Sequence, residues 1–183
     1  MQTMFQIPLH RINIGDYQVD FEHLLDKHEL EVGGYSTRAN THKLDLGDLE
    51  TEVLRHADNY WQEYGLDTWY EPEIHSSWAN RHYRGNETLV HNHSGAPIVA
   101  VYYKSVPEYS GRLFFENPLE YHMTHEPRVR PVIHTVDVQS GDLVIFPGFM
   151  KHGTEVSQSD LSRDIISFNF AKVNRKPKEI LYK

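Results

Sequence analysis

Three histidines are spaced as ligands of one metal ion would be. His91 and His93 are separated by one residue, and His152 follows the apolar run Leu143–Pro147, which is typical of a strand. Side chains alternate along a strand, so the first two imidazoles would face the same way and a second strand would bring the third. Three nitrogen ligands on one face leave positions open for a bidentate ligand and oxygen. Imidazole suits iron, zinc, copper and nickel, so the spacing alone does not name the metal.

The number of histidines limits what any one pair can show. The chain contains 13 of them, and a His-x-His pair taken alone could equally be a surface or hydrogen-bonded pair. The interpretation as a metal site therefore depends on the residues that follow the pair.

Arg163 opens a predicted strand and could anchor an anion. By alternation, Arg163, Ser167 and Asn169 share one face of that strand, which is a polar face for an otherwise apolar segment. A buried guanidinium without a partner is costly, so this face would require a polar ligand. A dicarboxylate fits, because the arginine can bind one end bidentately while a metal chelates the other. Ser167 could donate its hydroxyl to the same carboxylate. The alternative is a surface ion pair with Asp160 or Asp164.

One helix and a series of short strands would position these residues. Apolar and aromatic residues recur at spacings of three and four over Asp48–Tyr64, which predicts a helix ended by Gly65. From Trp69 onward, short apolar or alternating runs are separated by Gly, Pro and Ser. The predicted strands are Glu73–Asn80, Thr88–His93, Pro97–Lys104, Gly111–Glu116, Val132–Val138, Asp142–Pro147 and Asp164–Val173. Residues 1–47 read as irregular, with short strands around Phe5–Ile14.

This order of elements predicts a mainly β fold. Short strands following a helix favour a double-stranded β-helix, a jelly-roll or cupin-like barrel, with one or two supporting N-terminal helices. An aromatic content of 12% also favours sheet. We expect a single domain over residues 1–183, with its core at about 69–173.

Composition excludes several classes of protein. The formal net charge of −8 disfavours general binding to nucleic acid, because an acidic surface repels phosphates. The absence of cysteine excludes disulfides and thiolate metal sites. No signal-like segment and no apolar run of membrane length is present, so we expect a cytoplasmic protein with no membrane partner. The oligomeric state is open.

The motifs together resemble the 2-oxoglutarate/Fe(II) oxygenase superfamily, whose pattern is His-x-Asp/Glu, a distal His and a later Arg. Residues 91–103, 111–118 and 141–147 are similar to the corresponding segments of prolyl hydroxylases. A closer resemblance is to the 2OG-Fe(II) oxygenases of marine bacteria and cyanophages, and it spans roughly residues 73–171. The matching residues are Ser77-Trp78-Ala79-Asn80, Gly85, His91-Asn92-His93, Tyr102-Tyr103, Pro147, His152, Arg163 and Ser167-Phe168-Asn169.

The resemblance implies a fold, cofactors and a reaction. The fold would be a double-stranded β-helix, with Fe(II), 2-oxoglutarate and O2 as cofactor and cosubstrates. The reaction would hydroxylate an unidentified substrate, such as a prolyl or other amino-acid side chain, and release succinate and CO2. The substrate would be a small molecule or a peptide. No general acid or base is required.

The resemblance also assigns roles to individual residues. Those that match the metal positions are His91, His93 and His152. Those that match the cosubstrate positions are Arg163, Tyr103 and Ser167. Candidates for the substrate pocket are Trp78, Asn80 and Asn169, although Trp78 could equally pack in the core. The departure from the superfamily pattern is His93, where Asp or Glu is usual; the change makes the site more positive by one unit without removing a ligand.

Two other functions remain open from the sequence. The first is a cupin metalloenzyme that does not use 2-oxoglutarate, which Gly85 with His91-x-His93 fits, although the glutamate expected after His93 is missing. A cupin would also not require Arg163. The second is a non-enzymatic jelly-roll binding module, which predicts no tight metal site. Residues 1–47 and the loop 116–131 have no assigned role.

Overall fold

The computed structural model of the chain describes residues 6–20, 28–29, 34–37, 44–66, 68–119 and 133–175. In chain order the elements are β1 (His10–Asn13), β2 (His28–Glu29), β3 (Tyr35–Ser36), α2 (Asp48–Glu63), β4 (Tyr70–His82), β5 (Ile98–Ser105), β6 (Leu113–Glu116), β7 (Ile133–Val136), β8 (Asp142–Pro147), β9 (His152–Thr154) and β10 (Arg163–Asn174).

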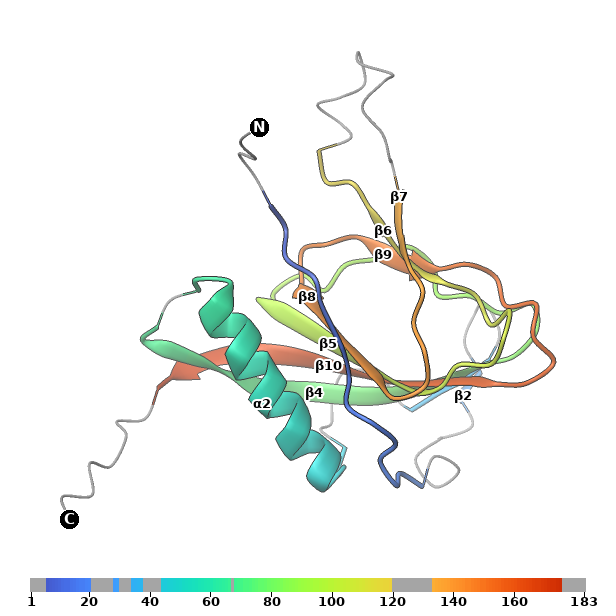
Figure 1. Cartoon of the computed structure of the whole chain (residues 1–183), viewed down its shortest axis with the longest axis horizontal. Coiled ribbons are helices and arrows are strands. Elements are labelled where there is room, and N and C mark those ends of the chain that lie inside the picture. The colour runs from blue at the N-terminus through green and yellow to red at the C-terminus, as the bar shows by residue number, and fades with distance from the viewer. Residues whose placement is uncertain are drawn as a thin grey trace.

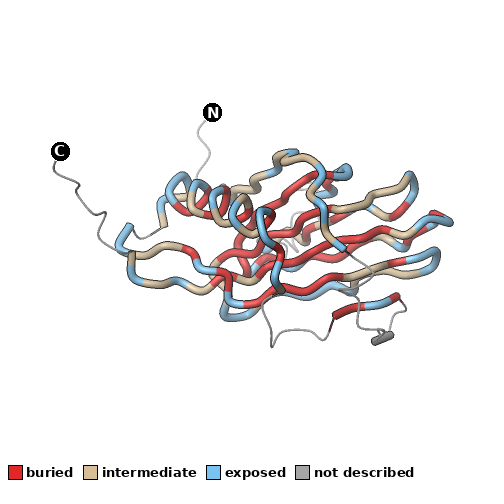
Figure 2. The backbone as a smooth tube through the Cα atoms, turned by 90° about the horizontal axis from the view of Figure 1, so that it is seen from below, coloured by how far each residue is buried: buried red, intermediate tan, exposed pale blue. Residues whose placement is uncertain are grey.

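The strands form two antiparallel sheets, which confirms the mainly β, double-stranded β-helix prediction. The major sheet has the order β1-β8-β5-β10-β4-β3-β2, and the minor sheet has the order β7-β6-β9. In Figure 1, α2 lies on one side of the major sheet and the minor sheet lies on the other. The major sheet is therefore covered on both faces, so β8 is buried along its length and the first six residues of β5 and of β10 are buried (Figure 2).

Alternation along β10 divides its side chains between two cores. Ile166 and Phe168 belong to the core shared with α2, whereas Ile165 belongs to the core between the two sheets. β10 pairs with β5 along one edge and with β4 along the other. Because Phe168 faces α2, the residues on either side of it in the sequence face the space between the sheets. Ser167, which is cross-strand from Trp78, is one of them.

The helix α2 is stabilised because its apolar face packs against the apolar face of the major sheet and both are buried. Its buried residues are Leu49, Val53, His56, Ala57, Tyr60 and Trp61. The helix ends at Glu63, one residue before the predicted Tyr64, and Gly65 follows with a φ of 72°. No other helix lies within the described ranges, and none there has the length and apolar character needed to cross a membrane.

The predicted strand Thr88–His93 is wrong. Residues 88–93 form no regular strand, and only a single bridge joins His91 to His152. Sequence patterns also missed β2, β3 and β9, which are two or three residues long and owe their pairing to neighbouring strands. The loop 116–131 lies largely outside the described residues, since 120–132 are not among them.

The core against α2 gives a first test of the fold. Phe168 is fully buried in the middle of β10, so we expect Phe168→Ala to lower the free energy of unfolding by about 3–5 kcal/mol through lost burial and a cavity. Urea unfolding of the metal-free protein measures this. Glu73→Ala, an exposed change on β4, is the control and should cost no more than about 0.5 kcal/mol. Equal losses in both variants would contradict the assignment of this core.

Candidate metal centre

The structure brings His91, His93 and His152 together. Each residue offers one ring nitrogen, and these three atoms all lie within 4.8 Å of one another. The ring centroids of His91 and His152 are 4.4 Å apart, and that of His93 lies 4.9 Å from the first and 5.1 Å from the second. Three imidazoles at this spacing fit a single divalent ion of the first transition series.

Backbone contacts rather than a regular strand position the first two histidines. The amide of His91 donates to the carbonyl of His152 over 3.0 Å, and the reverse bond is 2.9 Å. The amide of His93 donates to the carbonyl of Gly148. A Cβ on Gly148 would lie 2.0 Å from the carbonyl oxygen of Ala96, so this close approach requires glycine.

In two of the rings, a backbone hydrogen bond determines which nitrogen is free to bind a metal. Nδ1 of His91 lies 2.8 Å from the carbonyl oxygen of Leu89, and Nδ1 of His152 lies 2.9 Å from that of Met150. A carbonyl only accepts, so each Nδ1 carries the proton and each Nε2 is left as a lone-pair donor. A backbone partner of this kind fixes the ring orientation of metal-binding histidines.

Burial keeps the two inner rings neutral. It lowers the pKa of His152 to about 3; the hydrogen bond to Met150 opposes the lowering, and His91 and His93 add to it. It also lowers the pKa of His93 to about 4; His91 adds to the lowering and the neighbouring Asn169 side chain opposes it. Neutral imidazole is the form that binds metal. His91 is exposed, so the cluster opens toward solvent on its side.

A small cavity extends from the histidines into the space between the sheets. The residues that line it are Trp78, Asn80, Thr88, His91, His93, Val101, Tyr103, Leu113, His152, Gly153, Thr154, Ile165 and Ser167. No carboxylate is among these described residues. Burial raises the pKa of Tyr103, although Arg163 opposes the shift, so its phenol remains a protonated donor. The cavity is therefore suited to a negatively charged ligand.

Arg163 is buried beside this cavity, with only 1% of its surface exposed. Nη1 donates to the carbonyl of Gly111 at 2.8 Å, and Nη2 lies 3.0 Å from Oγ1 of Thr154 and 2.7 Å from Nδ1 of His82. Nε has no hydrogen-bond partner among the described residues. Three of the five guanidinium N–H groups are thus engaged, which leaves those on Nε and Nη1 for a ligand.

The alternative of a surface ion pair for Arg163 does not fit these contacts. Asp160 pairs with Arg84, and Asp164 pairs with Arg81 over 2.7 Å. Neither aspartate contacts Arg163 in the described parts of the chain, and the guanidinium has no carboxylate partner there. An uncompensated buried cation of this kind is stable only if a ligand or a polar cradle offsets its desolvation.

Two residues at this end of the cavity were missed by sequence reasoning. Oγ1 of Thr154 accepts from the amide of Thr88 and from Arg163, so its own hydroxyl proton is free to donate. His82 is cross-strand from Arg163. Alternation could have found both, because Thr154 lies two residues after His152 and His82 lies two residues after Asn80.

The three candidates for a substrate pocket lie near the histidines. Trp78 stacks on His93, with ring centroids 5.6 Å apart, and lines the cavity together with Asn80. Asn169 lies beside His93, and its Oδ1 makes no well-formed hydrogen bond within the described residues. Trp78 thus both packs in the interior and lines the cavity.

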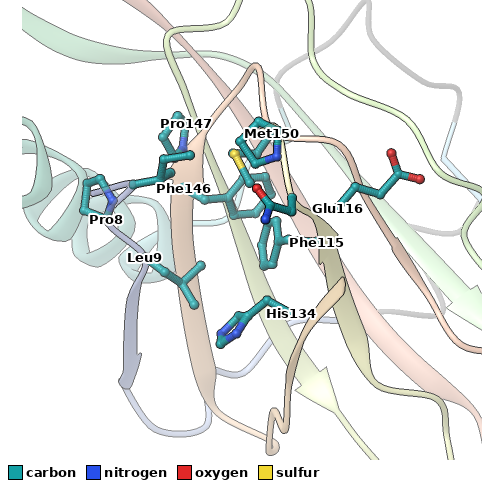
Figure 3. Close-up of a pocket in the computed structure, with 11 residues that line it drawn as sticks. Pro8, Leu9, Phe115, Glu116, His134, Phe146, Pro147 and Met150 are labelled. Atoms are coloured by element: carbon teal, nitrogen blue, oxygen red, sulfur yellow. The ribbon is translucent and has the colours of Figure 1, made fainter. Parts of the chain in front are cut away.

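A separate apolar hollow of about 230 Å³ lies near His152. Figure 3 shows Leu9, Phe115, Phe146 and Met150 around it. The rings of Phe115 and Phe146 also pack against His152, at 5.9 Å and 4.7 Å between centroids. These aromatic rings lie between the hollow and the histidine, and the hollow shares no lining residue with the histidine cavity.

The buried histidines predict acid lability of the metal-free protein. Burial and the charge of Arg163 lower the pKa of His82 to about 4, whereas the unfolded chain titrates near 6.5. The stability that the neutral His82 contributes is therefore fully present above about pH 6.5 and is lost as the pH falls from there toward 4. The difference between the folded and unfolded pKa of His82 corresponds to about 3 kcal/mol of folding free energy once the pH has fallen below both values.

Urea unfolding between about pH 7 and about pH 5 measures this effect, because most carboxylates stay ionised over that range. We expect the free energy of unfolding to fall as the pH is lowered, and to fall less steeply in His82→Asn. Identical slopes in the two proteins would show that His82 does not titrate in this way.

The chain matches a known protein family. Residues 76–169, just over half of the chain, match the family described as "Putative 2OG-Fe(II) oxygenase". No curated protein matches the sequence.

Among solved structures, the chain is similar to an oxidoreductase of the 2OG-Fe(II) oxygenase family from Burkholderia pseudomallei, at 13% identity and a TM-score of 0.57, over 80% of this chain and 72% of that one. It is similar to HygX from Streptomyces hygroscopicus with nickel, 2-oxoglutarate and hygromycin B bound, at 12% identity and a TM-score of 0.57, over 90% and 83% of the two chains. A prolyl-4-hydroxylase from Pseudomonas putida gives 16% identity and a TM-score of 0.52, over 85% and 80%. At these identities the likeness shows the shared fold.

Proposed function

The chain belongs to the 2OG-Fe(II) oxygenase family and is a 2-oxoglutarate-dependent dioxygenase, and from this premise we propose how its residues divide the work. His91, His93 and His152 hold Fe(II), and Arg163 binds the far carboxylate of 2-oxoglutarate in the cavity between them. The donor set fits, because three neutral nitrogen ligands converge and two have their Nε2 atoms preset.

One observation carries the cosubstrate assignment. Arg163 is a buried cation with an unsatisfied Nε and no carboxylate partner in the described residues, and it donates to Thr154, which lines the cavity that the histidines open. A ligand with a carboxylate at one end and a metal-chelating keto acid at the other would satisfy both ends at once. This geometry also disfavours the cupin alternative, which gives Arg163 no ligand to bind.

The remaining residues bind and orient. Fe(II) with 2-oxoglutarate and O2 supplies the oxidising chemistry, in which 2-oxoglutarate becomes succinate and CO2. Tyr103, Ser167 and Thr154 line the cavity and can donate hydroxyl protons to a carboxylate held by Arg163. Because His93 replaces the usual carboxylate, the charge of the site is more positive by one unit, which favours a dianionic ligand.

For the substrate, we propose hydroxylation of a small molecule or peptide, such as a prolyl or other amino-acid side chain. Trp78, Asn80 and Asn169 would contact it, because they lie beside His93 or line the same cavity. We also propose that all these residues belong to a single catalytic domain. Within the family, we place the chain near the enzymes of marine bacteria and cyanophages, on the Ser77-Trp78-Ala79-Asn80 and His91-Asn92-His93 motifs.

The experiment is anaerobic. Fe(II) and then 2-oxoglutarate are added to the purified protein, and the weak visible absorption of a keto acid chelated to Fe(II) is recorded. We expect a band that saturates with 2-oxoglutarate, and succinate formation once air is admitted. Iron binding without a band would contradict the cosubstrate assignment, and no iron binding would contradict the metal site.

A further inference from the structure

We propose that His82 is a positioning residue, which holds Arg163 in the orientation that receives the carboxylate of 2-oxoglutarate. This inference rests on the proposed function of Arg163. His82 is not a ligand of the metal and does not line the histidine cavity. Its role would be exerted through the guanidinium alone.

The sheet itself places the two residues together. His82 ends β4 and Arg163 opens β10, and they are direct cross-strand partners in the register of the major sheet. Both are almost completely buried, with 1% of each residue exposed. Nη2 of Arg163 lies 2.7 Å from Nδ1 of His82, a distance typical of a strong charge-assisted hydrogen bond.

The direction of this bond fixes the state of the imidazole. A guanidinium has five donors and no acceptor, so Nδ1 of His82 must carry the lone pair and Nε2 the proton. Burial and the neighbouring positive charge lower the pKa of His82 to about 4, which keeps the ring neutral under ordinary conditions. A neutral acceptor can orient the cation without competing with the carboxylate for its charge.

The ring is in turn held by close packing. A Cβ on Gly34 would lie 3.0 Å from Cδ2 of His82 and 2.5 Å from the carbonyl oxygen of Arg81, so only glycine allows this approach. β3, which follows Gly34, pairs with β4 next to His82. The backbone at Gly34 therefore packs close to the imidazole, and only 1% of His82 is exposed.

Holding Arg163 in advance benefits binding. A free arginine side chain samples many rotamers, and ordering it on binding weakens affinity. His82, Thr154 and the carbonyl of Gly111 take three N–H groups, so the two that remain, on Nε and Nη1, are already oriented when the ligand arrives. Loss of the His82 acceptor should weaken 2-oxoglutarate binding about tenfold through this ordering.

The test compares acceptors at two positions. In His82→Asn the amide oxygen takes the place of Nδ1, whereas in His82→Gln it takes the place of Nε2; His82→Leu has no acceptor. The dissociation constant of 2-oxoglutarate is measured by anaerobic titration of the Fe(II) protein, together with Fe(II) affinity, and with KM and kcat for succinate formation. We expect His82→Asn to bind 2-oxoglutarate within about threefold of the wild-type affinity, and His82→Gln and His82→Leu to bind it about tenfold more weakly. The loss should raise KM and leave kcat and the Fe(II) affinity unchanged.

Each failure is distinguishable. If the wild-type protein binds no 2-oxoglutarate, the proposed function fails. If it binds but His82→Gln or His82→Leu binds equally well or more tightly, the positioning role is overturned while the proposed function stands. If His82→Asn is as weak as His82→Gln, the acceptor at Nδ1 is not what matters, and the inference is again overturned. The Gln variant keeps the test decisive if the buried leucine prevents folding.

Discussion

Replacement of His152 by alanine is expected to abolish detectable Fe(II) binding and, with it, the formation of succinate from 2-oxoglutarate. His152 is the most buried of the three candidate ligands, and its Nε2 is preset by the bond from Nδ1 to Met150. Loss of groups that only orient a ligand costs about 10–100-fold in metal affinity, so loss of a ligand should cost more. Anaerobic calorimetry with Fe(II) measures the affinity directly.

The controls separate loss of a ligand from loss of the fold. His91 and His152 are joined through backbone N–H and C=O groups, so the bridge between them survives a change of side chain. The His152→Ala protein should therefore keep the far-ultraviolet spectrum of the wild type. His75→Ala removes an exposed imidazole on β4 and should leave Fe(II) affinity unchanged. A folded His152→Ala protein that binds Fe(II) as tightly as wild type would remove His152 from the ligand set.

Sequence patterns predicted those elements whose burial is continuous. The strand over Asp142–Pro147 has the predicted bounds, because every one of its residues is buried and turns at Gly141 and Gly148 flank it. The helix over Asp48–Glu63 differs from prediction by one residue at its end. In both cases a local pattern of apolar residues is sufficient, since the neighbouring elements only complete its burial.

The segment that carries His91 and His93 was predicted to lie beside His152 for an incomplete reason. The sequence argument placed His91 and His93 on one face of a strand, yet the segment is held by a single bridge and by a glycine that permits close approach. Such contacts join residues far apart in the chain and leave no periodic signal. The convergence of the three histidines came instead from spacing and family resemblance.

The environment of Arg163 shows a second limit. Alternation predicted that its strand carries a polar face, and Ser167 does line the cavity. The prediction of a bidentate fork did not foresee that His82 and Thr154 already occupy Nη2. Those partners come from β4 and β9, so only the sheet register reveals them.

Arg163→Ala is expected to weaken 2-oxoglutarate binding by about 100-fold or more while leaving Fe(II) affinity unchanged. Removal of one partner of a buried charge pair costs about 3–5 kcal/mol, which is more than a factor of 100 in a dissociation constant. Anaerobic titration of the variant with Fe(II) and then with 2-oxoglutarate separates the two affinities. Arg163→Lys keeps the charge but cannot reach the same three partners, so we expect it to recover only part of the loss.

Arg81→Ala is the matched control, because Arg81 lies on the neighbouring strand and is largely buried against Asp164, with 13% of its side chain exposed. Its loss breaks an ion pair and should lower stability, yet the Arg81→Ala protein should bind 2-oxoglutarate as wild type does. If Arg163→Ala lost Fe(II) and 2-oxoglutarate affinity in equal measure, the guanidinium would be supporting the shape of the cavity rather than binding its ligand. A loss confined to 2-oxoglutarate would separate the two ends of the site, the imidazoles that hold the metal and the cation that binds the carboxylate.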